Sequence, residues 1–307
     1  TTFDPGPEFA RSEFKYQRHP EVLGNMLGGN LFVCCCNNIN ADNYHYAAYP
    51  DGIPEGTPFA TFFGKQTQCF LTDMGFDVIW FSNGFGFGVD TWRTTGLLFD
   101  GTTFFPEKAK EAREKVLGFW DDFRKACPSF RVETRGTNLT TGIDLASDAL
   151  PLRDMYRNVS NLNPPPNSPW AALDANFGLE LTGMMSHIAE LPPGKGYPFR
   201  FYVHDVWWLN SPWLDRYDRM PHDIYLPLAC ARLNSTGAPE GPSQLNILSV
   251  DDSWGNAPDQ VPREVIPYLC DAFNTSPDQA GPVIWIYPFD EYHELAQDGY
   301  GLECPFA

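Results

Sequence analysis

The sequence predicts an α/β protein of the (β/α)8 barrel class, because strand-like and helix-like segments alternate along most of the chain. Six segments are short, nearly continuous runs of apolar and β-branched residues, which is typical of strands buried on both faces. They span residues 31–37, 77–83, 130–135, 199–205, 245–251 and 283–290. Alternation with helices implies that successive strands pair in parallel through right-handed crossovers.

The segments between these strands carry helical periodicity. After Pro106, the apolar residues Val116, Trp120 and Phe123 recur at four- and three-residue spacing among Glu and Lys. This pattern indicates an amphipathic helix with a proline in its first turn. The predicted helices span residues 59–74, 106–126, 170–190, 221–233 and 262–273.

Two architectures satisfy this order, a closed barrel and an open doubly wound sheet. We favour the barrel because polar residues follow nearly every strand, whereas a doubly wound sheet gathers its site at one switch point. Only six strands are visible and the chain ends soon after the sixth. The barrel is therefore incomplete or truncated, or two strands lie in irregular stretches such as residues 138–150. The Pro-rich residues 161–169 indicate a long loop over the barrel mouth, within a single domain spanning 1–307.

Composition excludes several classes of function. The 307 residues include 21 Lys and Arg against 39 Asp and Glu, for a formal charge of −18. A surface of this charge repels phosphate backbones and anionic headgroups, so we expect neither a nucleic-acid nor a membrane partner. The chain contains no GxSxG elbow, no CxxC pair and no HExxH spacing, which argues against serine hydrolases and zinc sites. We expect no metal and no cofactor.

Cysteines and glycosylation motifs bear on the compartment. The consecutive cysteines at 34–36 indicate buried thiols, whereas Cys127 and Cys304 leave one disulfide possible. Asn-x-Ser/Thr motifs begin at Asn138, Asn158, Asn234 and Asn274. These features lead us to expect an extracellular or periplasmic protein.

Polar and aromatic residues follow each predicted strand. The carboxyl ends of parallel strands meet at one opening of a barrel, where the loops carry function. Carboxylates and amides bind sugar hydroxyls and an aromatic face covers the apolar side of the ring, so this opening suits an oligosaccharide or glycoside. The residues predicted to bind substrate are Asn37, Asn38, Asn83, Arg135, Asn138, His204, Trp207, Trp208, Asp252, Trp254 and Asp290.

On these features the chain resembles the broad superfamily of (β/α)8 glycoside hydrolases, without matching one family in particular. The resemblance rests on the strand-terminal Asp and Glu, on residues 75–80 as a helix-to-strand junction, and on the neighbouring aromatics. Residues 250–255 are similar to the strand-end Asp-Asp-Gly-Trp of some α-galactosidase-type barrels, with Ser253 replacing the glycine. The resemblance implies two carboxyl groups that flank a glycosidic bond, one a general acid and the other a nucleophile or base.

Strand alternation ranks the candidate carboxylates. In residues 245–251, Leu248 and Val250 suit the helix-facing side, so that Ile247 and Asp251 point into the barrel. The same reasoning places Glu291 inward after the last strand. We therefore predict Asp251 and Glu291 as the acid and the nucleophile or base, with Asp205 as the substitute for either.

The remaining strands are less decisive. Phe199 and Phe201 are expected to face outward, which turns His204 inward. Glu133 falls inward between Arg131 and Arg135, and an ion pair would explain it without catalysis.

Two other functions fit the same features. One is a catalytically inert carbohydrate-binding barrel, and the other is a sugar-acid lyase or isomerase with Mg²⁺ or Ca²⁺ on the clustered carboxylates. An Asp after a strand is also a common turn former or helix N-cap. Glycoside turnover with and without a chelator separates these alternatives.

Overall fold

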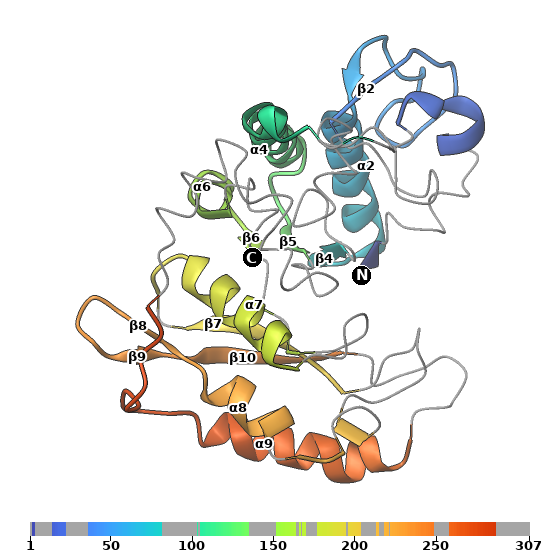
Figure 1. Cartoon of the computed structure of the whole chain (residues 1–307). Coiled ribbons are helices and arrows are strands. Elements are labelled where there is room, and N and C mark those ends of the chain that lie inside the picture. The colour runs from blue at the N-terminus through green and yellow to red at the C-terminus, as the bar shows by residue number, and fades with distance from the viewer. Residues whose placement is uncertain are drawn as a thin grey trace. The chain divides into compact units, whose positions relative to one another are not determined.

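The computed structural model of the chain (Figure 1) describes residues 2–3, 14–22, 36–81, 103, 105–134, 152–163, 166, 168–169, 177–194, 196–203, 213–214, 218–220, 222–248 and 258–286. The chain divides into two units. The first comprises Thr1–Thr137, Ile143–Pro164 and Pro288–Ala307. The second comprises Asn138–Gly142 and Pro165–Tyr287.

The first unit contains a four-stranded sheet in which every neighbouring pair runs parallel. Its order is β1 (Thr2–Phe3), β4 (Val78–Phe81), β5 (Arg131–Thr134) and β6 (Leu162–Asn163). Neighbours in this sheet therefore follow chain order, without the reversal that defines a doubly wound sheet. A separate antiparallel pair, β2 (Asn38–Ile39) with β3 (Thr57–Pro58), brackets an irregular loop before the first long helix.

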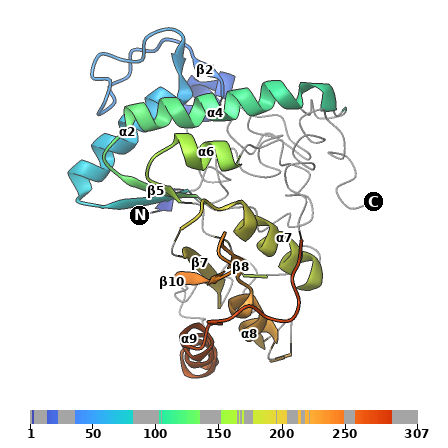
Figure 2. The same ribbon diagram turned by 90° about the vertical axis from the view of Figure 1, so that its left-hand side faces the viewer.

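Helices connect these parallel strands, as crossovers require. The helix α2 (Phe59–Met74) precedes β4, η3 (Pro106–Lys108) and α4 (Ala109–Ala126) lie between β4 and β5, and α6 (Leu152–Asn158) leads to β6. In both views α2 and α4 lie side by side (Figure 1, Figure 2). Gly64 permits this approach, because a Cβ there would lie 2.7 Å from the Ala126 Cβ and 2.8 Å from the Phe123 carbonyl oxygen.

Aromatic rings fill the core of the first unit. The Phe63 ring centroid lies 5.3 Å from that of Phe81 and 5.6 Å from that of Phe123, and Phe81 lies 6.2 Å from Trp120. Phe81, Phe123 and Trp120 are fully buried. Aromatic pairs at these separations contribute about 0.5–1.5 kcal/mol each beyond the area they bury. The helix periodicity of residues 106–126 thus corresponds to packing of α4 onto α2 and β4.

A buried arginine fixes the end of α4. The Arg124 guanidinium donates hydrogen bonds to the carbonyls of Cys127, Phe130 and Asn161, at 2.7, 2.7 and 3.2 Å. Burial lowers the pKa of Arg124 below its usual value, but an arginine side chain remains cationic in proteins. One side chain therefore satisfies carbonyls in the turn after α4, in the approach to β5 and in the turn before β6.

The second unit contains a parallel pair, β7 (Tyr197–Tyr202) with β10 (Pro242–Leu248). The helix α7 (Phe177–Glu190) precedes β7, and α8 (His222–Ala229) lies between β7 and β10. The short hairpin of β8 (Arg232–Leu233) and β9 (Pro239–Glu240) follows α8. After β10, η5 (Val261–Val265) continues into α9 (Ile266–Asn274), which packs against α8.

An arginine also anchors the hairpin of the second unit. Arg232 on β8 donates to Glu240 Oε2 on β9 at 2.9 Å and to the carbonyls of Ile188, Leu191 and Pro192. These carbonyls lie in and after the last turn of α7, where a helix leaves its acceptors unsatisfied. The hairpin is thereby held against the C-terminus of that helix.

Much of the predicted order is confirmed, as a mixed α/β arrangement with parallel sheets. The strands β4, β5, β7 and β10 correspond to four of the six predicted strands, and α2 and α4 match their predicted ranges. No closed barrel is formed by the residues that the structure describes. The single-domain prediction stays a prediction.

Four element predictions need correction. Residues 36–37 form a turn instead of the end of a strand, and the rest of 31–37 lies outside the described residues. The predicted helix 221–233 ends at Ala229, because residues 232–233 pair in the β8–β9 hairpin. Within the expected loop 161–169, Leu162–Asn163 is the strand β6. Finally, residues 283–286 form no strand and are exposed.

The Pro-rich segment also supplies an edge to β7. The Arg200 amide donates to the Pro166 carbonyl at 2.9 Å, and the Ser168 amide donates to the Arg200 carbonyl at 2.8 Å. Proline lacks an amide donor but keeps its carbonyl acceptor, so it is compatible with a sheet edge. None of the helices in the described ranges is long and apolar enough to cross a bilayer.

We expect Arg124→Met to lower the free energy of unfolding by about 3 kcal/mol, because the carbonyls of Cys127 and Phe130 lose their guanidinium donor, whereas the Asn161 carbonyl keeps the Val132 amide. Lys125→Met is the matched control. Its ammonium is exposed and pairs with Asp121 at the surface, so little change is expected. Urea denaturation measures both, and equal effects of the two substitutions would contradict this role of Arg124.

Candidate functional site

Most of the predicted site lies outside the described residues. This applies to the proposed catalytic carboxylates and to most of the substrate-binding residues, namely Asp205, Asp251, Glu291, Asn83, Arg135, Asn138, His204, Trp207, Trp208, Asp252, Trp254 and Asp290. Their roles stay predictions. Asn37 and Asn38 are described: Asn37 directly precedes β2, and Asn38 is the first residue of β2.

The register of β7 and β10 constrains the residues that follow both strands. Leu245 lies opposite Phe199 and Ile247 lies opposite Phe201. Residues directly opposite each other in a sheet project to the same face, since side chains alternate in phase along paired strands. Phe201 and Ile247 therefore project to the same face. The sequence analysis predicted that Phe201 faces outward and Ile247 inward, and one of these two predictions is wrong. The sequence reasoning failed here because it assigned each strand separately.

The expected ion pair at Glu133 is confirmed. Glu133 on β5 is 9 % exposed, and its Oε1 lies 3.0 Å from the guanidinium of Arg131. Arg131 lies two residues away on the same strand, so both side chains leave the same face. This pair accounts for a carboxylate on the strand without a catalytic role.

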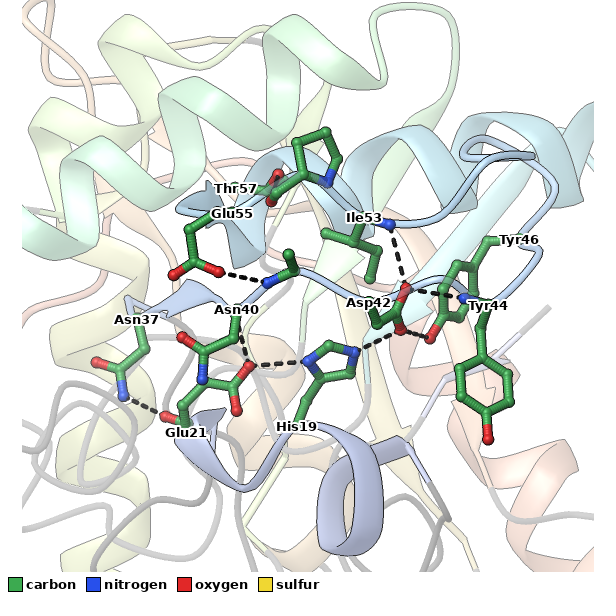
Figure 3. A network of polar contacts seen from close by, with 12 residues as sticks. His19, Glu21, Asn37, Asn40, Asp42, Tyr44, Tyr46, Ile53, Glu55 and Thr57 are labelled. Atoms are coloured by element: carbon green, nitrogen blue, oxygen red, sulfur yellow. Dashed lines mark hydrogen bonds and ion pairs between the residues drawn. The ribbon is translucent and has the colours of Figure 1, made fainter.

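A second set of polar residues, absent from the predicted site, surrounds a buried histidine (Figure 3). His19 is 0 % exposed and lies between two carboxylates. Its Nδ1 is 2.8 Å from Glu21 Oε1, and its Nε2 is 2.8 Å from Asp42 Oδ2. We call His19, Glu21, Asp42 and Tyr46 the His19 cluster.

Asp42 is the acceptor at the centre of the His19 cluster. Tyr46 donates its hydroxyl to Oδ2 at 2.5 Å, and the amides of Tyr44 and Ile53 donate to Oδ1 at 3.2 and 3.1 Å. Burial opposes ionisation of Asp42, but the hydrogen bonds from Tyr46, His19 and the two amides outweigh it and lower its pKa. Burial and this carboxylate together raise the pKa of Tyr46.

The His19 cluster fixes the chain on both sides of β2. The Asn37 side-chain amide donates to the Glu21 carbonyl at 2.6 Å, and the Asn40 amide donates to Glu21 Oε1 at 2.8 Å. The predicted substrate residue Asn37 therefore uses its amide group in a backbone contact. Arg18 covers Tyr44, its guanidinium carbon 4.2 Å from the ring centroid.

The chemistry of the His19 cluster is that of a buried structural network. Both imidazole nitrogens lie 2.8 Å from carboxylate oxygens, so both are occupied by contacts within the protein. His19 and Asp42 are 23 positions apart in the sequence, without a motif that relates them. Local sequence patterns therefore gave no signal for this pair.

The second unit holds a buried acid at the start of α8. Asp223 is 4 % exposed. Burial is the main cause that raises the pKa of Asp223 to about 7. The negative charge of Asp218 raises this pKa further, and a hydrogen bond with the Met220 backbone lowers it in part. The turn before α8 is unusual, because Asp218 and Arg219 both have positive φ angles, 56° and 57°. Neither residue is a glycine, so this backbone stores strain.

Glu264 on η5 stabilises that turn. Its Oε1 accepts hydrogen bonds from Trp213 Nε1 and from Arg219 Nε, both at 2.8 Å. The hydrogen bond from Trp213 lowers the pKa of Glu264, and the contact with Arg219 lowers it further. Burial opposes part of this shift. The contacts tie the strained turn to the helix that follows β10.

Comparison of the chain with models of protein families, with curated proteins and with solved structures gave no match.

Among the residues described here, no three His, Cys, Asp or Glu side chains gather in a way that could hold a metal ion. Cys127 is a buried free thiol, and burial raises its pKa.

We expect Tyr46→Phe to lower the free energy of unfolding by about 1–2 kcal/mol, because Asp42 loses a charge-assisted hydrogen bond. The pKa of Asp42 should rise toward its ordinary value, so the variant should lose less stability than the wild type on acidification below pH 4. Tyr44→Phe, at an exposed ring in the same loop, is the control. Urea denaturation across pH tests the pair, and equal behaviour of both variants would refute the assignment.

We expect Asp223→Asn to stabilise the protein above neutral pH. A carboxyl whose pKa is raised in the folded state prefers its proton there, so its contribution declines as pH rises from about 4 through 7. The melting temperature of the variant should equal that of the wild type near pH 4 and exceed it progressively up to pH 8. Asp278→Asn, at an exposed turn, should show no such divergence, and parallel pH profiles for Asp223→Asn would be the contrary result.

Proposed function

We propose that the chain is a glycoside hydrolase on a (β/α) barrel, with strand-end carboxylates as its acid and nucleophile. The observation that carries this proposal is the register of β7 and β10. Tyr202 lies opposite Leu248, and Asp205 and Asp251 each follow these residues by three positions. Continued pairing in this register brings the two carboxylates to the same level on neighbouring strands.

The order of the strands supports the barrel. In the first unit β4, β5 and β6 are parallel neighbours in chain order, and in the second unit β7 and β10 repeat this relation around α8. Singly wound order of this kind is the order of a barrel wall. Each of the strands β4, β5, β7 and β10 also runs directly into a segment that contains predicted site residues.

The spacing of neighbouring strands suggests the stereochemistry. Strands lie about 4.8 Å apart, and carboxyl groups about 5–5.5 Å apart are typical of retaining glycosidases. We therefore place Asp205 ahead of Glu291 as the partner of Asp251. One carboxyl donates its proton to the glycosidic oxygen while the other bonds to the anomeric carbon. Water then cleaves that ester bond and returns the proton to the first carboxylate.

The charge of the chain favours an uncharged substrate. With a formal charge of −18, long-range repulsion would disfavour anionic sugars. Amide and aromatic residues around the predicted opening, such as Asn83 and Trp254, suit hydroxyl groups and the apolar faces of sugar rings.

The test is a panel of chromogenic glycosides with and without EDTA. We expect metal-independent release, and Asp205→Asn and Asp251→Asn should each lower kcat on the order of 100-fold or more. Asp278→Asn, at the exposed turn after α9, is the matched control and should retain full activity. Binding without release would indicate the inert barrel, and chelator-sensitive turnover of sugar acids would indicate the lyase or isomerase. Activity of both Asn variants within about tenfold of wild type would overturn the assignment.

A further inference from the structure

The hairpin of β8 and β9 carries an Asn-x-Ser/Thr motif at its tip (Figure 1). Asn234, Ser235 and Thr236 lie between the two strands, and Gly237 and Ala238 complete the turn. Asn234 is half-buried, whereas the four residues after it are exposed. The Asn234 amide donates to the Ala238 carbonyl at 2.9 Å and closes the turn. The motif therefore lies on an exposed turn whose backbone is fixed.

The carboxamide oxygen of Asn234 accepts three hydrogen bonds. They come from the Thr236 amide at 2.9 Å, the Thr236 hydroxyl at 2.7 Å and the Ala238 amide at 3.0 Å. Hydrogen-bond donors placed on an oxygen stabilise negative charge that develops there. When the carboxamide nitrogen loses a proton, charge moves to this oxygen, so the turn favours the nucleophilic form of the nitrogen.

Neither of the other two motifs in the described ranges has this arrangement. In the motif of Asn274, the Ser276 hydroxyl donates to the Phe273 carbonyl at 2.8 Å, after the end of α9. In the motif of Asn158, the middle residue Val159 is 3 % exposed and belongs to the core of the first unit. One hydroxyl is thus turned to the backbone, and the other motif is anchored in a core.

We propose that Asn234 is a site of N-linked glycosylation, and that its turn selects it over Asn158 and Asn274. The donor is an oligosaccharide on a lipid-linked diphosphate, presented by a glycosyltransferase. The carboxamide nitrogen gives a proton to a base of the transferase and bonds to the anomeric carbon of the first sugar. The bond from that carbon to the diphosphate breaks, and the diphosphate leaves with the electrons of that bond.

The folded hairpin is compatible with this glycan. The sugar replaces one of the two hydrogens on the carboxamide nitrogen and leaves the oxygen unchanged, so the three hydrogen bonds at Asn234 persist. The exposed residues that follow leave room for a bulky polar group. The proposal concerns a modification of the β8–β9 hairpin and not hydrolytic activity, so either can fail without the other.

Mass spectrometry of the full chain, produced in the secretory pathway of a cell that attaches N-linked glycans, tests the proposal. Enzymatic release of the glycans in heavy-oxygen water converts each occupied Asn into a labelled Asp. We expect Asn234 to be occupied in most molecules, and Asn158 and Asn274 in a smaller fraction. Secreted and cell-retained protein are both analysed, so poor secretion does not hide the result. An unmodified Asn234, or occupancy no higher than at the other two positions, would overturn the proposal.

Two glycine variants separate the effect of the turn from that of the motif. Gly237 has a φ of 79°, so Gly237→Ala strains the turn and leaves the motif intact. Occupancy at Asn234 should fall about twofold or more in this variant. Gly241→Ala, directly after β9, is the matched control, because a Cβ there meets nothing within 4 Å. Unchanged occupancy in Gly237→Ala, or an equal fall in both variants, would contradict selection by the turn.

Discussion

Parallel pairing between successive strands is the constraint on which the rest of this structure depends. A parallel neighbour cannot be reached by a tight turn, so the chain must cross the sheet between strands. The helix α4 between β4 and β5, and α8 between β7 and β10, meet this requirement in the two units. The same constraint places the carboxyl ends of paired strands at one edge. Residues that follow strands, and not those within them, are therefore the natural positions for chemistry.

Irregular segments in both units are held by charged side chains that serve several backbone groups at once. Arg124 supplies donors to two carbonyls in the connection between α4 and β5 and to one in the turn before β6. Arg232 donates to three carbonyls at the end of α7. Asp42 is the inverse case, an acceptor for two amides and two side chains. Because buried backbone groups must be satisfied, these side chains replace the hydrogen bonds that regular structure would provide.

Periodicity predicted the long elements well and the short ones poorly. One face or both faces are buried in each of the long elements α2, α4, β4 and β5. The spacing of their apolar residues follows from that burial and could be recognised in the sequence. The strand β6 has only two residues, which is too short for any periodic signal. Pro166 contributes a carbonyl acceptor to a sheet edge. The Pro-rich composition of this segment predicted a loop and gave no sign of that contact. The His19 cluster joins residues distant in sequence, which no single-sequence pattern relates.

The register of paired strands decides which side chains share a face of the sheet, and the alternation within one strand cannot decide this. Each strand by itself has two possible orientations, but the pairing of Ile247 with Phe201 ties the orientation of β10 to that of β7. The proposal extends this phase relation to Asp205 and Asp251, which would then leave one face together. Both residues belong to the second unit, so their pairing requires nothing of the first. Two carboxylates on adjacent strands cannot both ionise easily, since like charges at this distance repel. In the proposed mechanism, this repulsion would favour a proton on one carboxyl of the pair, and that difference in protonation would separate the general acid from the nucleophile.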